Sequence, residues 1–259
     1  MLGRAAVSHL ARNLWRVHAP LDMARFRTDA LRGLAPLSLM QRGAHLARVM
    51  RAHLPARYAD AIDVMLASLT PPLARTDRFG LGGFFYLPHI SFVTLYGLDP
   101  THNGGRDPFG ASMRAQYELT RRFSSEFSLR AFLAAQPERT LRVLQRWTRD
   151  ADPHVRRLCS EGTRPRLPWA ARLPDFMADP RPLLPILEAL KDDPDLYVRR
   201  SVANHVGDIA KDHPGLALAL CRQWLTDASA ERRWLIRHAL RYPARRGMRA
   251  ALVLRRQAL

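Results

Sequence analysis

The chain has 259 residues, 47% hydrophobic and 25% charged, a balance that excludes global disorder and suffices to bury a sizeable core. Its 41 basic and 23 acidic residues give a formal net charge of +18, so a polyanion such as nucleic acid or an anionic membrane surface is the expected partner. Two cysteines are too few for a disulfide framework or a cysteine-rich zinc site and indicate a reducing cytoplasm, and no apolar run is long enough to predict a membrane span.

Helical periodicity dominates the first 69 residues. Residues 1–21 predict an amphipathic helix, although their three arginines and lack of acid leave a transit peptide as the alternative. Residues 37–53 and 57–69 predict two further helices. Their expected apolar faces are Leu37, Met40, Ala44, Ala47, Met50 and Leu54 for the first, and Tyr58, Ala61, Ile62, Met65, Leu66 and Leu69 for the second.

The segment 70–108 is rich in proline and glycine and predicts loops with one short helix around 89–97. Within it, Gly80-Leu-Gly-Gly83 is not followed by the Gly-Lys-Ser/Thr of a phosphate-binding loop and predicts a tight loop instead. Residues 1–109 are therefore expected to consist of helices followed by this loop-rich segment.

An internal repeat occupies the second half of the chain. Three segments align at offsets of 43 and then 34 residues, and both offsets hold at every aligned position. The aligned positions are Trp147, Leu190 and Trp224; Asp150, Asp193 and Asp227; and the stretches 154–157, 197–200 and 231–234. Each segment predicts a helix, a turn and a second helix, the unit of a HEAT-like solenoid, with a generic helical bundle as the alternative. Asp152-Pro153 and Asp193-Pro194 are expected to start second helices, because Asp caps a helix and Pro fits its first turn.

An arginine pair opens the second helix of each repeat, at 156–157, 199–200 and 232–233. Stacked repeats would place these pairs in a row, and guanidinium groups bind phosphate oxygens bidentately. The pairs therefore predict a phosphate-binding row, the alternative being a solvated face with local Asp–Arg pairs.

Two segments carry single side chains suited to chemistry or stacking. Glu126 lies among apolar neighbours, so its carboxylate is expected to be used or to pair with a nearby arginine. The candidate arginines are Arg121, Arg122 and Arg130. In the segment 160–169, Trp169 follows Arg164 and Arg166, a combination that stacks on nucleotides unless the tryptophan belongs to the core.

A third segment, 201–213, has a polar stripe at helical spacing. Its members are Asn204, Gly207, Asp208 and Lys211. A polar stripe facing a basic groove is unusual for a structural helix, so Asp208 is a candidate functional carboxylate. Cys159 is expected to be a buried structural thiol, and no zinc-ligand spacing is present, so no metal site is expected.

Three stretches, 112–127, 156–169 and 196–214, resemble the AlkC branch of the AlkC/AlkD family of HEAT-like-repeat alkylpurine DNA glycosylases, and the resemblance runs from about residue 25 to 250. It implies an all-α HEAT-like solenoid forming a single domain over 1–259, with the active-site groove in 110–259. It also implies excision of cationic alkylated bases from double-stranded DNA without a metal, a cofactor or full base flipping. The implied substrate is 3-methyladenine, with 3-methylcytosine and 7-methylguanine as further candidates.

The resemblance also implies roles for individual residues. Glu126 and Asp208 match the family's catalytic carboxylates, and Trp169 matches the aromatic residue that contacts the lesion nucleotide. The expected DNA-binding residues are Arg156, Arg157, Arg164, Arg166, Arg199, Arg200, Asn204 and Lys211, with Arg166 and Asn204 added from their positions beside Trp169 and Asp208. Gly207 departs from the family's asparagine and is expected to loosen its helix.

The protein is accordingly expected to act as a cytoplasmic, nucleoid-associated monomer without membrane contact and without the C-terminal immunoglobulin-like domain of some family members. Carboxylates near the sugar would stabilise its oxocarbenium-like transition state. The alternatives are a non-catalytic HEAT-repeat scaffold that binds DNA and a solenoid that binds other proteins.

Overall fold

The computed structural model describes residues 1–76 and 81–259, and over these residues the chain is all-helical, without strands. They form two compact units, an N-terminal unit of residues 1–131 and a C-terminal unit of residues 132–259. The single-domain organisation stays a prediction. In the described ranges, no helix combines the length and the apolar character that crossing a bilayer would require.

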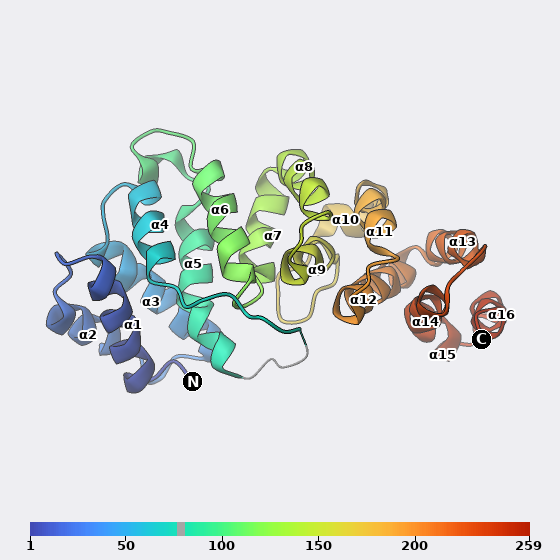
Figure 1. The fold of residues 1–259 in the computed structure, drawn as a ribbon, viewed down its shortest axis with the longest axis horizontal. Coiled ribbons are helices and arrows are strands. Elements are labelled where there is room, and N and C mark those ends of the chain that lie inside the picture. Colours follow the sequence, from blue (N-terminus) through green and yellow to red (C-terminus); the bar gives the residue numbers. More distant parts are fainter. Residues whose placement is uncertain (77–80) are drawn as a thin grey trace. The chain divides into compact units, whose positions relative to one another are not determined.

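The N-terminal unit is built mainly from paired helices, with α3 packed along α5 and α1 against α2 (Figure 1). Its elements are α1 (Arg4–Val17), α2 (Met23–Leu31), α3 (Leu39–His53), α4 (Tyr58–Ala67), the 3₁₀ helix η1 (Leu81–Tyr86), α5 (Leu87–Tyr96), the 3₁₀ helix η2 (Pro100–Asn103), α6 (Phe109–Thr120) and the start of α7 (Glu126–Ala135). The predictions of helices within 1–21, 37–53 and 57–69 are therefore confirmed.

The expected apolar face of α3 was partly wrong. Met40 is 42% exposed, whereas Gly43, Leu46 and Met50 are buried. Gly43 lies on the contact with α5, where an added Cβ would be 3.2 Å from the Cβ of Leu87. The apolar periodicity did not indicate Gly43, because glycine has no apolar side chain. Its contribution is that the missing side chain allows the two helices to approach closely.

The segment 70–108 contains more regular structure than expected. The predicted short helix is α5, which begins two residues before the predicted start, and η1 and η2 flank it. Of the predicted tight glycine loop, Gly82 and Gly83 lie in η1, which is a short helix rather than a loop, and Gly80 lies outside the described residues.

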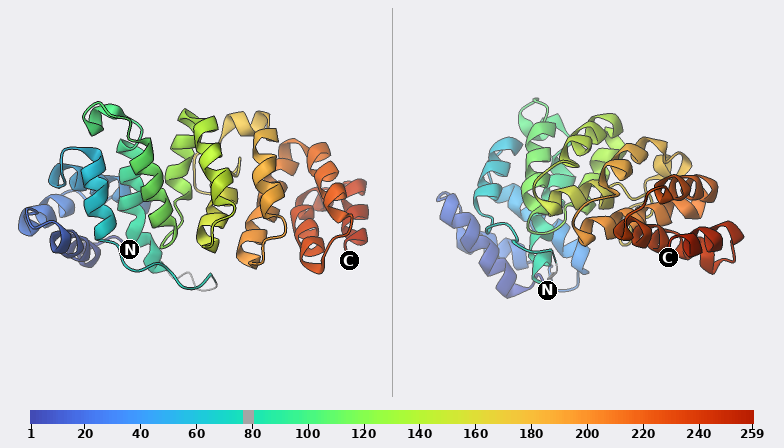
Figure 2. Two further views of the ribbon diagram at one scale, coloured as in Figure 1. Left: turned by 45° about the horizontal axis from the view of Figure 1, so that its top comes forward. Right: turned by 45° about the vertical axis from the view of Figure 1, so that its right-hand side comes forward.

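The C-terminal unit consists of stacked helix pairs. Its elements are α8 (Pro137–Trp147), α9 (Pro153–Glu161), α10 (Pro174–Ala178), the 3₁₀ helix η3 (Arg181–Leu183), α11 (Leu184–Leu190), α12 (Leu196–Asp212), α13 (Pro214–Leu225), α14 (Ala230–Ala239), α15 (Arg241–Arg245) and α16 (Arg249–Gln257). The pairs are α8–α9, α11–α12 and α13–α14, and their second helices pack in the order α9, α12, α14. The pairs follow one another in chain order from yellow-green to red in both views of Figure 2. The second helices begin at residues 153, 196 and 230, which are the predicted offsets of 43 and 34, so the HEAT-like repeat is confirmed.

The turn inside the first two repeats is built the same way. Asp150 accepts a hydrogen bond from the backbone N–H of Asp152 at 2.8 Å, and Asp193 accepts from that of Asp195 at 2.9 Å. Asp152 and Asp195 then cap α9 and α12. The predicted helix start at Asp193-Pro194 is therefore wrong by two residues, because Asp193 shapes the turn and Asp195 is the cap.

One arginine of each pair binds the turn before it. Arg156, Arg199 and Arg233 each donate to backbone carbonyls five or six residues earlier, at 2.5–3.2 Å. Arg156 also binds Asp193 of the next repeat through two hydrogen bonds of 2.6 and 3.1 Å. These three arginines therefore have structural roles, and Arg156 also joins two repeats. The phosphate-binding row expected from the sequence stays a prediction.

We expect Arg156→Gln to lower the free energy of unfolding by about 3 kcal/mol, because it leaves the buried Asp193 carboxylate without its cation. Arg200→Gln, which removes an exposed arginine of the same pairs, should lower it by less than about 0.5 kcal/mol. Chemical denaturation measures both values, and equal losses would contradict the structural role given to Arg156.

Candidate functional site

Five charged side chains of the C-terminal unit form one continuous chain of ion pairs, here called the α9–α12 cluster. Its members are Arg157, Glu161, Arg164, Asp208 and Lys211. Glu161 lies 3.4 Å from Arg157 and 2.7 Å from Arg164. Asp208 accepts from Arg164 Nε at 2.8 Å on one oxygen and from Lys211 Nζ at 2.9 Å on the other. The cluster thus joins the end of α9, the segment after it and the last turns of α12.

Glu161, Arg164 and Asp208 are buried, and their charges are kept by mutual contact. Burial alone would raise the pKa of Glu161, but Arg157 and Arg164, together with the hydroxyl of Ser201 at 2.7 Å, hold that pKa below its ordinary value. Burial opposes the charge of Arg164 as well, and Glu161 and Asp208 outweigh it, so the Arg164 pKa is raised. Three cations therefore face two carboxylates, and the cluster has a net charge of +1.

The segment 162–173 between α9 and α10 is fixed to α12 by two arginines. Arg164 binds Asp208, and Arg166 binds Asp212 one helical turn later through two hydrogen bonds of 2.7 Å each. A backbone hydrogen bond of 3.1 Å from Leu173 to Pro165 closes the segment. These contacts give an irregular segment a defined conformation.

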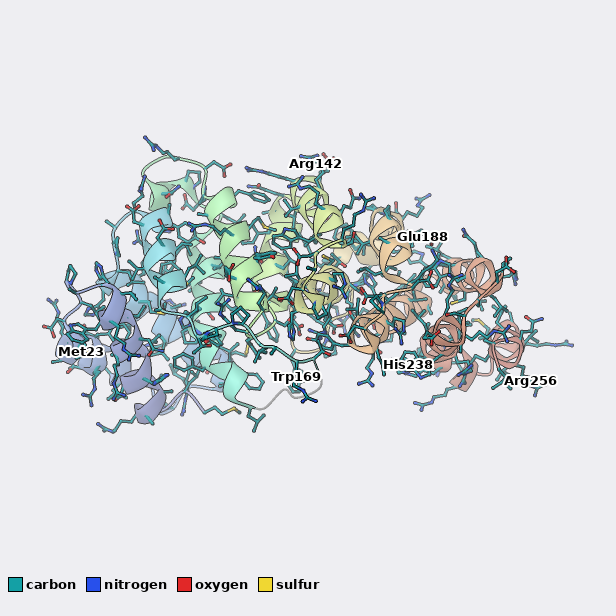
Figure 3. All side chains as sticks on the ribbon, viewed as in Figure 1. Met23, Arg142, Trp169, Glu188, His238 and Arg256 are labelled. Atoms are coloured by element: carbon teal, nitrogen blue, oxygen red, sulfur yellow. The ribbon has the colours of Figure 1, made fainter. Side chains whose placement is uncertain are left out.

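Trp169 projects from this fixed segment, as Figure 3 shows, and 85% of its surface is exposed. The alternative of a core tryptophan is therefore wrong. Its backbone is in the left-handed region at φ 63°, which costs a residue with a Cβ about 1 kcal/mol. A large aromatic side chain held in solvent on a strained, fixed backbone is suited to stacking on a flat ligand.

Asp208 is enclosed, with only 3% of its side chain exposed, and both of its oxygens bind cations. Lys211, with 38% of its side chain exposed, is its most accessible neighbour in the cluster, and its Nζ also lies 5.9 Å from the centre of the Tyr242 ring. Lys211 is therefore the more exposed of the two cations that bind this carboxylate.

The glycine before Asp208 allows two helices to approach closely. An added Cβ on Gly207 would lie 3.3 Å from the carbonyl oxygen of Ala239 in α14. The helix α12 continues through Gly207 without a break, from Leu196 to Asp212. The packing of α14 against this position thus offsets the looseness expected of a mid-helix glycine.

Glu126 belongs to the N-terminal unit, where it is the first residue of α7. It is half-buried, and the hydroxyl of Ser124 donates to its Oε2 at 2.7 Å. Of the arginines expected near it, Arg121 and Arg122 both contact Glu118. Glu126 and Asp208 lie in different units, so their convergence on one substrate stays a prediction.

The remaining predicted residues have varied surroundings. Asn204 accepts from Arg241 at 2.9 Å and from His238 at 3.1 Å. Arg200 is exposed, and the guanidinium of Arg157 lies 4.8 Å from the Tyr197 ring centre. The remaining positions, Arg156 and Arg199, are bound to the turns described above. The expected DNA-binding residues therefore do not form one uniform surface.

The thiol of Cys159 is fully buried and contacts two backbone carbonyls at 3.3 Å, and burial raises its pKa, as expected for a structural cysteine. Over residues 1–76 and 81–259, no three His, Cys, Asp or Glu side chains are grouped so that they could hold a metal ion.

The sequence analysis missed Glu161 and Ser201. The sequence analysis gave Glu161 no role, but α9 continues to this residue and its carboxylate accepts a hydrogen bond from Ser201 of α12. The available signal was its spacing, four residues after Arg157 and three before Arg164, which places three charges on one helix end.

Comparison with known proteins finds similar chains. No protein-family profile matches the sequence. The Bacillus subtilis protein YhaZ, whose activity is uncharacterized, is 36% identical over 218 residues, which are 84% of this chain and 56% of YhaZ. The solved structure of Pseudomonas fluorescens alkylpurine DNA glycosylase AlkC, bound to DNA containing an abasic site analog, is 39% identical with a TM-score of 0.84 and matches 98% of this chain. This chain spans 66% of that AlkC chain, so it covers less than two thirds of the length of both relatives.

Protonation of buried histidine should destabilise the C-terminal unit in acid. His205 is fully buried beside the cluster, and burial lowers its pKa to about 4, while Asp208 opposes this shift. An unfolded chain takes up that proton near pH 6.5 and the folded chain only near pH 4, so stability is lost as the pH falls through this interval. The loss should reach about 1.4 kcal/mol per pH unit. Urea denaturation between pH 7 and pH 4 should show a shallower dependence for His205→Leu, and equal slopes would contradict the assignment.

Proposed function

The chain belongs to the AlkC branch of the AlkC/AlkD family, and we propose that it is a DNA glycosylase that hydrolyses the N-glycosidic bond of cationic alkylated bases. The observation that carries the proposal is the exposed Trp169 on a segment that Arg164 fixes to the buried carboxylate of Asp208. An aromatic stacking surface and a carboxylate are the two groups that such a reaction needs side by side. The related AlkC was solved with DNA containing an abasic site analog, and an abasic site is what base removal leaves behind.

The departing base needs little assistance from the protein. A purine alkylated at N3 is already cationic and leaves without prior protonation, so no metal ion or cofactor is needed. As the bond breaks, positive charge moves to the sugar, and a carboxylate about 4 Å away stabilises it by about 4 kcal/mol at an effective dielectric of 20. That corresponds to about three decades in rate. We assign this role to Asp208 and Glu126, which also position the attacking water.

Lys211 regulates access to Asp208 in this proposal. In the free protein the Asp208 charge is balanced by Arg164 and Lys211, so little of its field is left for a substrate. A DNA phosphate competes for the half-exposed ammonium of Lys211. When Lys211 binds phosphate, Asp208 keeps only Arg164 and becomes accessible to the sugar.

The other assignments follow from exposure and, for Arg157, from its position in the α9–α12 cluster. Trp169, which is exposed, stacks on the lesion nucleotide, and we expect reaction without full base flipping, as the family resemblance implies. Arg157, Arg200 and Lys211 contact phosphates, whereas Arg164 and Arg166 position the Trp169 segment through Asp208 and Asp212. We expect a monomer that acts on double-stranded DNA in the bacterial cytoplasm. Its first substrate is 3-methyladenine, with 3-methylcytosine and 7-methylguanine to be compared.

A single-turnover assay of base release from methylated duplex DNA tests the catalytic assignment. We expect Asp208→Asn and Glu126→Gln each to slow release by about 100-fold or more, because each removes negative charge that faces the transition state. Asp227→Asn is the matched control, since this aspartate is exposed and its φ of 50° suits asparagine. Unchanged rates in both variants would refute the catalytic assignment. A chain that binds the duplex but releases no base is instead a non-catalytic DNA-binding scaffold.

The variant Trp169→Ala tests whether Trp169 contributes to DNA binding without contributing to the stability of the fold. Because the side chain is exposed, the free energy of unfolding should change by less than about 0.5 kcal/mol. Loss of stacking should weaken binding to lesion-containing DNA by about 1–3 kcal/mol, measured by fluorescence anisotropy. Trp15→Ala, at a partly exposed tryptophan of α1, is the control and should leave that affinity unchanged. Equal affinities for the Trp169 variant and the unmodified chain would exclude the stacking role.

A further inference from the structure

Three arginines gather where α12 meets α14 and α15 without an acidic partner. Arg200 lies on α12, and Arg241 and Arg245 lie on α15. Among the residues that the structure describes, none of the three is within ion-pair distance of a carboxylate. Elsewhere in the same unit Arg156, Arg166 and Arg232 each bind an aspartate through two hydrogen bonds. The absence of a carboxylate therefore distinguishes this group from the arginines that hold the fold.

The central guanidinium of the group is held in place by neutral partners. Arg241 donates to the side-chain oxygen of Asn204 at 2.9 Å and to the carbonyl of His238 at 2.9 Å. Burial lowers the pKa of Arg241, and the charges of Arg164 and Arg245 lower it further, while Asp208 opposes them. The neighbouring cations therefore repel the charge of Arg241, and a bound anion would reduce this repulsion.

Neutral His238 contacts both Asn204 and Arg241. Burial, together with Arg241 and Arg200, lowers its pKa to about 4, so it carries no charge near pH 7. Its Nε2 donates to the same Asn204 oxygen at 3.1 Å, and its ring stacks on Trp234 with centres 5.0 Å apart and planes 21° apart. Asn204 thus fixes both a cation and an aromatic stack relative to α12. His238 is labelled in Figure 3.

This group is continuous with the candidate site. Asn204, Asp208 and Lys211 recur at helical spacing along α12, and the Lys211 ammonium lies 5.9 Å from the ring centre of Tyr242 in α15. Trp234 occupies the repeat position held by Arg157 and Arg200 in the two preceding repeats. The same repeat position therefore presents an aromatic side chain next to the unpaired arginines.

We propose that Arg200, Arg241 and Arg245, with Arg241 held by Asn204 and His238, form a second binding surface for the phosphodiester backbone of duplex DNA, one repeat beyond the α9–α12 cluster. The ligand is a polyanion because these three cations of the described chain have no carboxylate within ion-pair distance. The guanidinium groups suit phosphate oxygens, which they bind bidentately. The inference rests on the proposed function only for the identity of the ligand as DNA, not for the chemistry of base release.

The test is the salt dependence of binding to an undamaged duplex, measured by fluorescence anisotropy. Each phosphate contact contributes about 0.9 to the slope of log K against log salt. We expect Arg241→Gln combined with Arg245→Gln to reduce that slope by about 1.8. The matched control combines Arg222→Gln and Arg249→Gln, which remove two charges from exposed positions on α13 and α16 and should leave the slope unchanged.

Equal slopes for the two double variants, or a wild-type chain that does not bind the duplex, would overturn the proposal. If loss of the Arg241 hydrogen bonds unfolds the first variant, Arg245→Gln alone should reduce the slope by about 0.9, against Arg222→Gln alone as its control. Because the duplex is undamaged, the measured slopes report binding and do not depend on base release. A chain that binds with the expected slopes but releases no alkylated base refutes the proposed function and leaves the surface in place.

Discussion

The guanidinium of Arg164 lies buried between the carboxylates of Glu161 and Asp208, and much of the C-terminal unit depends on that contact. Removing Arg164 would leave each of these two buried carboxylates with one cation instead of two, Arg157 for Glu161 and Lys211 for Asp208, and would therefore destabilise the unit. The same contact fixes the segment that displays Trp169 and occupies one oxygen of Asp208. The stability of the unit and the geometry of the candidate site therefore rest on the same side chains.

The large positive charge is divided between two uses. In each pair one arginine donates to the carbonyls of the preceding turn, as Arg156, Arg199 and Arg233 do. Other arginines, such as Arg166 and Arg232, bind single aspartates across neighbouring helices. Arg200, Arg241 and Arg245 have no such partner in the described chain. A net charge of +18 thus overstates the charge available to a ligand, because many guanidinium groups are already bound to the protein.

The repeat was predictable from the sequence because it rests on local patterns. The offsets of 43 and 34 residues are visible in the aligned tryptophans, aspartates and arginines, and the helix starts follow them. The start of α12 was wrong by two residues because two aspartates compete for the cap, and only the contact with Arg156 shows which one shapes the turn. Met40 and Gly43 in α3 show a similar limit, since a glycine at a close helix contact leaves no apolar signal.

The candidate site was only partly predictable for a related reason. Trp169, Asp208 and Lys211 were identified by residue type and by the family resemblance, whereas the role of Glu161 depends on α9 ending beside α12. The burial of Asp208 also required the three-dimensional structure, because Arg164 and Arg166 reach it and Asp212 from 44 and 46 residues away. Side-chain type reveals which chemistry is possible, and packing decides which carboxylate is accessible.

The candidate site depends on the difference in length between α9 and α12. These helices occupy the same repeat position, yet α9 has 9 residues and α12 has 17, so the last two turns of α12 have no counterpart in its neighbour. The chain freed by the early stop of α9 is the segment that carries Arg164, Arg166 and Trp169. The candidate site thus lies where α12 continues past the end of α9, and extending α9 by two turns would remove the irregular segment that carries Trp169 while every side chain of α12 stayed the same.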